Sequence, residues 1–235
     1  TPIDDNDSAV DAVNENAAAG TSVGITAFAS DADATTNAVT YSLDDNASGR
    51  FQIDSLTGIV TVGVTPLDFE SAANHSIIVR ATSADGSSTT RAFSIAIRDL
   101  NDNAPVITVG QQFSVSELAS AGTLVGNVAA SDIDTVGSLQ NWKIVGGNAS
   151  GIFTIDAATG RLSIADATPL DFETTPTYTL TLSVSDGVST SATQTVLISV
   201  LDDNEAPVMA PSQVLSINEN SAAGTFVGNV VAADQ

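Results

Sequence analysis

Hydrophobic and polar residues alternate along much of this chain, with the period of two that half-buried β-strands require. The alternation is clear in SIIVRATSADG at residues 76–86 and in TRAFSIAI at 90–97, where successive side chains would point to opposite faces of a sheet. FQIDSLTGIVTV at 51–62 and FTIDAATGRLSI at 153–164 place a glycine-containing turn between two short apolar runs, which is typical of a β-hairpin. No segment has a helical period, so the pattern predicts an all-β protein.

The same motifs return at a nearly constant distance. AGTSVG at 19–24 recurs as AGTLVG at 121–126 and as AGTFVG at 223–228, each time 102 residues later. TPLDFE at 65–70 returns at 168–173. This last step is one residue longer than the step of the AGTSVG motif. Loop insertions and deletions produce such small differences, so the chain contains an internal repeat.

Each full repeat holds roughly seven predicted strands with turn signals about every 8 to 12 residues, which is typical of an immunoglobulin-like sandwich. We therefore predict tandem seven-stranded Greek-key sandwiches. Repeat 1 is expected at residues 1–104, repeat 2 at 105–206 and the N-terminal part of a third repeat at 207–235.

The composition is strongly acidic, with 28 Asp and Glu residues against 6 Lys and Arg and a net charge of −22 at pH 7. Such a surface repels other polyanions, which argues against nucleic acids and anionic membranes as partners. The chain is nevertheless 43% hydrophobic, unlike disordered acidic tails. It has no Cys, which excludes disulfides and thiolate metal sites. No apolar run reaches the roughly 18 residues of a membrane span, and the first residues do not form a signal peptide, so we expect an interior part of a longer protein.

The acidic residues recur with the fold. The first repeat carries Glu15, Asp31, Asp33, Asp68, Glu70, Asp85, Asp99 and Asp102, and the second carries Glu117, Asp132, Asp134, Asp171, Glu173, Asp186, Asp202 and Glu205. DLNDNAPV at 99–106 concentrates four acid or amide side chains in five positions, which is more than a turn needs. The surplus oxygens at this linker predict a site for a cation.

Together these motifs resemble the cadherin repeat family, in its bacterial cadherin-like form. The resemblance rests on Glu15, on Asp-Phe-Glu at 68–70, on DLNDNAP at 99–105, on Asp-Ile-Asp at 132–134 and on Asp186. It covers both repeats and the start of the third. It implies a calcium-rigidified tandem repeat of a large cell-surface or secreted adhesin, which acts in cell adhesion as a stiff spacer and adhesive array outside the cell.

The resemblance also implies a calcium site around the linker 99–103, with up to three ions per junction. The expected ligands are Glu15, Asp68, Glu70, Asp99, Asn101, Asp102, Asn103, Asp132, Asp134 and Asp186, with backbone carbonyls of Leu100 and Asn141. Ca²⁺ takes about six to eight oxygen ligands and binds extracellular modules at roughly 10⁻⁴ to 10⁻³ M. Without metal, like charges about 4 Å apart repel by roughly 1 to 4 kcal/mol per pair. The junction is therefore expected to be flexible without calcium and stiff with it.

The second junction departs from this pattern. LDDNEAPV at 201–208 is one residue shorter than DLNDNAPV when Asp202 is aligned with Asp99, so Glu205 replaces Asp102 and the last Asn is missing. We expect at most a partial site there. Its expected ligands are Glu117, Asp171, Glu173 and either Asp203 or Glu205. Residues 208–235 can form about two strands, too few to fold alone, and are expected either to be disordered or to pair with the edge of another chain.

Three other readings of the sequence stay open. Any single Asp in these loops can serve only a turn. The paired acids at 68 and 70 and at 171 and 173 also resemble glycosidase carboxylates, but active sites are seldom duplicated with each repeat, so no enzyme is predicted. A polysaccharide- or protein-binding module is the alternative function, although aromatic residues make up only 5%. The expected partners are calcium, adjacent repeats, and another copy of the chain or a cell-surface polysaccharide.

Single residues carry less information. His75 is expected on a strand surface and Trp142, the only Trp, in a core or anchoring a loop. Asn46 and Asn148 begin Asn-Ala-Ser sequons but are expected to serve the turns that precede Phe51 and Phe153.

Overall fold

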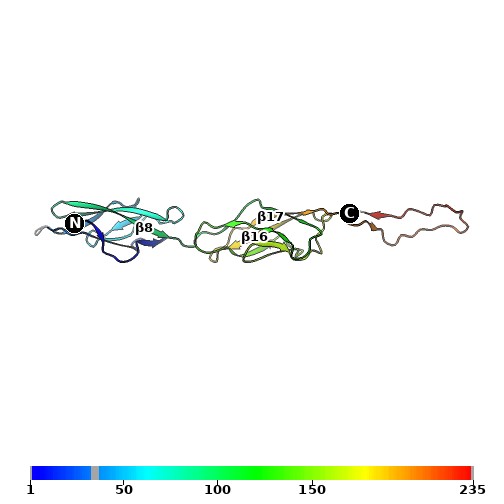
Figure 1. Ribbon diagram of the computed structural model, residues 1–235, viewed down its shortest axis with the longest axis horizontal. Helices are drawn as coiled ribbons and strands as arrows, with labels where there is room; N and C mark the ends of the chain where they lie inside the picture. Colours follow the sequence, from blue (N-terminus) through cyan, green and yellow to red (C-terminus); the bar gives the residue numbers. More distant parts are fainter. Residues whose placement is uncertain (1, 33–36, 234–235) are drawn as a thin grey trace. The chain divides into compact units, whose positions relative to one another are not determined.

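The computed structural model describes residues 2–32 and 37–233, and every regular element in them is a β-strand (Figure 1). The chain divides into two compact units. The first unit comprises Thr1–Asn103 together with Asp132–Ser138, and the second comprises Ala104–Ser131 and Leu139–Gln235. The prediction of an all-β fold built from immunoglobulin-like sandwiches is confirmed. In the part of the chain that the structure describes, no helix is long and apolar enough to cross a membrane.

The first unit contains two four-stranded sheets. One has the order β1 (Asp4–Asp5), β3 (Ser22–Phe28), β6 (Ile59–Val62) and β5 (Phe51–Ile53), and the other β2 (Ala12–Asn14), β8 (Ser88–Arg98), β7 (Asn74–Ser83) and β4 (Val39–Asp45). β2 runs parallel to β8, whereas β7 is antiparallel to both of its neighbours. Because β1 and β2 are separated by only a few residues and join different sheets, they act as two halves of one edge strand, which leaves the seven strands that the sequence predicts.

The alternating pattern of β7 and β8 becomes the core of this sandwich. Ile77 and Val79 on β7 and Ile95 on β8 are each 0% exposed, while Ile78, between the first two, is exposed. The predicted hairpin at 51–62 is formed by β5 and β6. In its turn Asp54 Oδ1 accepts hydrogen bonds from Leu56 N and Thr57 N, and Gly58 adopts a φ of 71°, in the left-handed region that favours glycine.

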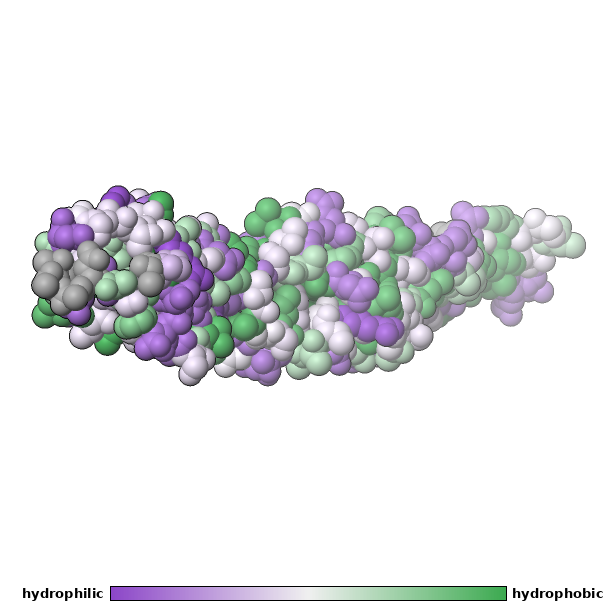
Figure 2. Space-filling model, turned by 60° about the vertical axis from the view of Figure 1, so that its left-hand side comes forward, coloured by the Kyte–Doolittle hydropathy of each residue, from purple (hydrophilic) through white to green (hydrophobic). Residues whose placement is uncertain are grey.

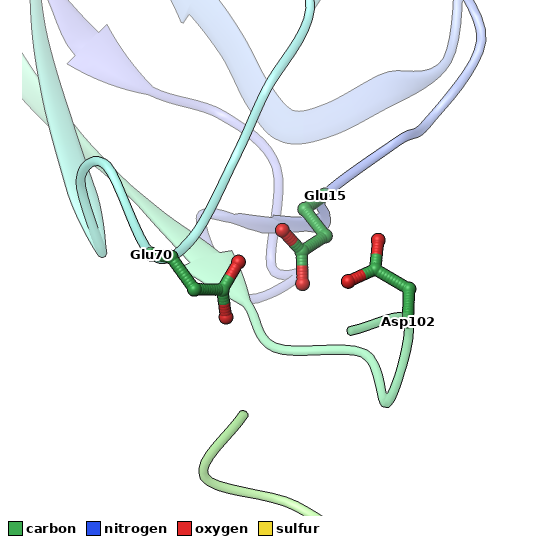
Figure 3. A group of neighbouring side chains, drawn as sticks. All are labelled: Glu15, Glu70 and Asp102. Atoms are coloured by element: carbon green, nitrogen blue, oxygen red, sulfur yellow. The ribbon is translucent and has the colours of Figure 1, made fainter. Parts of the chain in front are cut away.

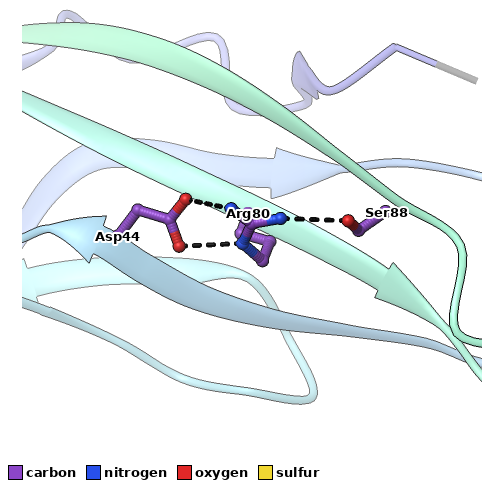
Figure 4. Close-up of polar contacts among 3 residues, drawn as sticks. All are labelled: Asp44, Arg80 and Ser88. Atoms are coloured by element: carbon purple, nitrogen blue, oxygen red, sulfur yellow. Dashed lines mark hydrogen bonds and ion pairs between the residues drawn. The ribbon is translucent and has the colours of Figure 1, made fainter.

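The outward face of β4, β7 and β8 carries a polar network (Figure 4). Arg80 on β7 donates to both carboxylate oxygens of Asp44 on β4, from Nε at 2.8 Å and from Nη2 at 2.5 Å, and to Ser88 Oγ on β8 at 3.0 Å. One guanidinium thus connects three neighbouring strands. Over the face seen in Figure 2, hydrophilic and hydrophobic residues are intermingled, as expected for a solvated sandwich surface.

The second unit repeats this plan, except that the strands of its smaller sheet are divided between a three-stranded and a two-stranded sheet. Its larger sheet has the order β10 (Gln112–Ser116), β17 (Gln194–Leu201), β16 (Thr177–Ser185) and β13 (Gln140–Gly146), and a three-stranded sheet has the order β11 (Leu124–Asn127), β15 (Arg161–Ile164) and β14 (Phe153–Ile155). β9 (Val106–Ile107) pairs with β12 (Ala130–Ser131). Trp142 is 4% exposed and lies in this core, as the sequence predicts. Its ring passes so close to Gly160 that a Cβ added there would be 2.8 Å from Trp142 Cε2.

The segment that follows the second sandwich has little core of its own. β18 (Val208–Met209) and β19 (Ala232–Ala233) pair, which matches the expected capacity for about two strands. Val214 and Phe226 between them are 89% and 74% exposed. This segment therefore buries little of its hydrophobic surface, and the two alternatives given for it above remain predictions.

Candidate metal centre

Carboxylates from separate segments of the first unit point toward one another. Glu15 follows β2, Glu70 precedes β7 and Asp102 follows β8, and Figure 3 shows Glu15 between the other two. One oxygen of each lies within 4.8 Å of the others. Glu70 also forms a second group, within the same limit, with Asp99 and Asp134. Five carboxylates thus make two overlapping groups that share Glu70.

Glu15 is held in place by the backbone. Its Oε1 accepts a hydrogen bond of 2.8 Å from Leu100 N, and its Oε2 accepts one of 2.8 Å from Phe69 N. The residue is only 2% exposed. The buried carboxylate therefore ties the start of the linker to the loop that carries Glu70, and each of its oxygens keeps a further lone pair for another partner.

The segment 132–138 is bound to the linker by hydrogen bonds. Asn103 donates from N to Asp134 Oδ2 at 3.0 Å and from Nδ2 to Asp134 Oδ1 at 2.8 Å. The same amide group lies 2.9 Å from Asp102 Oδ1. Thr135 donates to Asp99 Oδ2 from its backbone N at 2.6 Å and also from Oγ1. These contacts bring Asp134 next to Glu70, although the two residues are far apart in sequence.

The cluster has negative charge and unsatisfied oxygens. Glu70 Oε1, Asp99 Oδ1 and Asp132 Oδ2 are buried with no hydrogen-bond partner among the described residues. Burial raises the pKa of Glu70, and the charges of Glu15, Asp134 and Asp99 raise it further. The two ion pairs found in the described part of the chain, Arg80–Asp44 and Arg91–Asp4, involve none of these carboxylates.

Such a donor set fits a hard divalent cation. Buried polar atoms without partners are costly, and carboxylate and amide oxygens are the ligands that Ca²⁺ prefers. The chain has no Cys to supply a thiolate, and its one His, His75, is not part of these groups. The residues present therefore match calcium in chemistry as well as in proximity.

Not every predicted ligand joins these groups. Asp68 is exposed, and its two oxygens accept hydrogen bonds of 2.9 Å from Ser71 N and Ser71 Oγ. These bonds lower its pKa. Leu100 contributes its amide to Glu15, and Asn101 is half-buried in the same linker. Asp186 and Asn141 belong to the second unit; Asp186 is buried and accepts from the backbone N of Val188 and Ser189 at 2.6 and 2.7 Å.

The second unit has a related group of carboxylates. Glu117, Glu173 and Asp202 bring oxygens within 4.8 Å of one another. Glu117 accepts from Asp203 N and Phe172 N, each at 2.8 Å, which repeats the bonds of Glu15. This correspondence aligns Asp203 with Leu100 and supports the reading that the second linker is one residue shorter.

As in the first unit, some acids near this group have carboxylate oxygens without a hydrogen-bond partner among the described residues, and others accept hydrogen bonds from nearby residues. Both carboxylate oxygens of Glu205 are buried without a partner among the described residues, and burial followed by the charge of Glu117 raises its pKa. Asp171 is bonded to Thr174 N and Oγ1, each at 2.9 Å, and Asp203 accepts from Ser116 Oγ. Asp202 was not predicted as a ligand, although its alignment with Asp99 is the signal that would have found it.

Comparisons with known proteins agree with this architecture. The model of the cadherin domain family matches residues 11–98 and 111–201. Chicken Cadherin-1 is 35% identical over 94% of the chain, and human Protocadherin Fat 4 is also 35% identical over 94%. The chain spans only 27% of the first protein and 5% of the second.

Solved structures show the same likeness. The structure of mouse Cadherin-23 EC22-24 matches 96% of the chain and 74% of its own length, with a TM-score of 0.63 and 28% sequence identity. The Protocadherin GammaB4 extracellular domain matches 99% of the chain and 40% of its own length, with a TM-score of 0.69 and 25% identity.

Proposed function

The chain belongs to the cadherin family, and we propose that it is a calcium-binding, calcium-stiffened tandem repeat of an extracellular adhesion protein. The observation that carries the proposal is the pair of overlapping carboxylate groups at Glu70 in the first unit. Bound calcium would supply positive charge to carboxylates that repel one another, and coordination to Glu70 Oε1 and Asp99 Oδ1, which have no hydrogen-bond partner among the described residues.

The protein's own residues set the ligands in place. Glu15 joins the linker to the Glu70 loop through two backbone amides, and Asn103 presents both oxygens of Asp134 through two hydrogen bonds. These bonds hold the ligands close to one another, so little reorganisation is expected when calcium binds. Repulsion among the five carboxylates opposes this arrangement until it is neutralised. The linker 99–103 is therefore expected to be held firmly only where calcium is plentiful, which is outside the cell.

The second unit is proposed to hold calcium more weakly. Its carboxylate group lacks a counterpart of Asn103, because Ala206 follows Glu205. Glu117, Glu173, Asp202 and Glu205 can still offer carboxylate oxygens. A second, weaker step in a calcium titration is the expected consequence.

Adhesion is proposed to involve another protein surface, such as a second copy of the chain. Carbohydrate recognition is not favoured, because Tyr41, Phe51, Phe93, Trp142 and Phe153 are buried and the two exposed phenylalanines, Phe28 and Phe226, belong to different units. The paired acids also give no support to glycosidase chemistry, since Asp68 is engaged with Ser71 rather than with Glu70.

Calcium titration combined with thermal melting tests the proposal. Wild-type protein should melt at a higher temperature in millimolar calcium than in chelator, and Asp102→Asn should lose most of this increase. Asp4→Asn is the matched control, because Asp4 pairs with Arg91 on a different part of the unit, and it should respond to calcium as the wild type does. A wild-type melting temperature that calcium does not change would refute the proposal.

A further inference from the structure

The two oxygens of Asp99 have different surroundings. Oδ2 accepts hydrogen bonds from the backbone N of Thr135, at 2.6 Å, and from Thr135 Oγ1. Oδ1 is buried and has no hydrogen-bond partner among the described residues. One residue therefore fixes one edge of the carboxylate, while the other edge is left without a donor in the group formed with Glu70 and Asp134.

The burial of Asp99 Oδ1 without a donor requires an explanation, because a carboxylate that could rotate would not stay in this position. An unpaired buried oxygen costs free energy, and rotation about the side-chain bonds of Asp99 would let both oxygens reach water. Two donors on Oδ2 oppose that rotation. Thr135 itself is exposed and lies outside the carboxylate groups, so it acts on the site through Asp99.

We propose that Thr135 is a positioning residue for metal binding, which holds Asp99 so that its Oδ1 is presented to the cation. The inference rests on the proposed calcium site and extends it to a residue that provides no ligand. Partners that orient metal ligands affect affinity without touching the metal. The first repeat has Ala34 at the position that corresponds to Thr135, so its copy of the Asp-x-Asp motif is followed by a residue without a side-chain hydroxyl.

A matched control exists elsewhere in the same unit. Thr57 donates to Asp54 Oδ1 from N at 2.8 Å and from Oγ1 at 2.9 Å, which is the same chemistry in a hairpin turn away from the cluster. Removing the Thr57 hydroxyl should affect only stability. Removing the Thr135 hydroxyl should affect calcium affinity.

The test is a calorimetric calcium titration of wild type, Thr135→Val, Thr135→Ser and Thr57→Val. Thr135→Val should raise the calcium dissociation constant by roughly 3- to 30-fold, Thr135→Ser should restore it, and Thr57→Val should leave it unchanged. If the calcium dissociation constant of Thr135→Val equals that of a wild type that binds calcium, the role of Thr135 would be refuted and the proposed function would stand. Absence of binding by the wild type would instead overturn the proposed function on which it rests.

A measurement without metal separates positioning from general destabilisation. In chelator, hydrogen exchange at the Thr135 amide should be slow in wild type and fast in Asp99→Ala, since that amide donates to Asp99. Equal exchange in both proteins would show that the contact is not maintained and would also overturn the inference.

Discussion

The backbone amide of Leu100 donates a 2.8 Å hydrogen bond to Oε1 of the buried Glu15, and Asp203 N makes the same 2.8 Å bond to Glu117 Oε1. Glu15 and Glu117 thus accept equivalent backbone hydrogen bonds in the two units, although the segments 99–106 and 202–208 differ in length and sequence. A buried carboxylate that accepts two backbone N–H groups stabilises the local fold even before any metal binds.

Glu15→Ala should therefore destabilise the metal-free protein. Two amides, those of Leu100 and Phe69, would lose a charged acceptor, and the expected loss in unfolding free energy is about 2 to 4 kcal/mol. Urea denaturation in chelator measures it. Glu219→Ala is the control, because Glu219 occupies the equivalent place in the third repeat but is exposed, and it should change stability by less than about 0.5 kcal/mol. Equal stability of Glu15→Ala and wild type would show that this bond is not needed.

Glu70→Gln should have opposite effects in the two metal states. Burial and the charges of Glu15, Asp134 and Asp99 raise the pKa of Glu70, so its charged form opposes folding. That opposition is absent in acid and grows as the pH rises through the raised pKa. At neutral pH in chelator, Glu70→Gln should melt at a higher temperature than wild type. In calcium it should melt at a lower temperature, because a charged ligand is lost.

The comparison for Glu70→Gln is Glu219→Gln, which removes the same charge at an exposed site. Its two melting temperatures should follow those of the wild type. If Glu70→Gln destabilised the protein equally with and without calcium, repulsion within the cluster would not be the force that calcium relieves.

His75 should make the first unit less stable in mild acid. Burial and the charge of Arg50 lower the pKa of His75 from its ordinary value of 6.5, and its Nε2 is buried without a partner among the described residues. The unfolded chain therefore binds a proton more readily than the folded one. Stability should be complete above about pH 6.5 and should fall as the pH drops toward the lowered pKa.

The second repeat suggests a variant that tests the pH dependence assigned to His75, because it has Tyr178 at the corresponding position. Tyr178 packs against Phe153 with ring centroids 5.3 Å apart, as His75 packs against Phe51 at 6.0 Å. His75→Tyr should keep the packing and abolish the pH dependence in that range, measured by urea denaturation between pH 8 and 5. Persistence of the same slope in His75→Tyr would assign it to other groups.

Leu67→Ala should strongly destabilise the first unit. Leu67 is 0% exposed, directly precedes the Asp-x-Glu motif, and accepts a 3.2 Å hydrogen bond from Asn16 N through its carbonyl. A cavity of this kind costs about 2 to 5 kcal/mol, which chemical denaturation resolves. Val64→Ala is the comparison because Val64 is 88% exposed. Similar stabilities of the two variants would mean that the loop is not anchored through Leu67.

Much of the fold could be predicted from the sequence because strand alternation and the repeat act together. The residues at 77, 79, 95 and 97 had to face one core, and they do. The acids that recur with the repeat also mark the loops on either side of the linker 99–103. The resemblance to cadherin repeats names Glu15, Glu70, Asp99, Asp102 and Asp134 among the expected ligands, and the structure brings these five into overlapping groups.

Other features depend on contacts that spacing alone does not specify. The Asp-x-Glu motif suggests two equivalent ligands, but adjacent polar groups compete for an Asp side chain, and Asp68 bonds to Ser71 instead of joining Glu70. A Ser three residues after the Asp is the local sign of such a turn. The role of Thr135 could not be predicted, because its bond to Asp99 joins residues 36 positions apart in sequence.

The central claim is that calcium at the Glu70 groups stiffens the linker between the repeats, and ¹⁵N relaxation measures this directly. In saturating calcium, the amides of residues 11–98 and 111–201 should report one shared rotational correlation time, and in chelator two shorter and different ones. Two short, independent correlation times that persist in calcium-saturated protein would contradict the account.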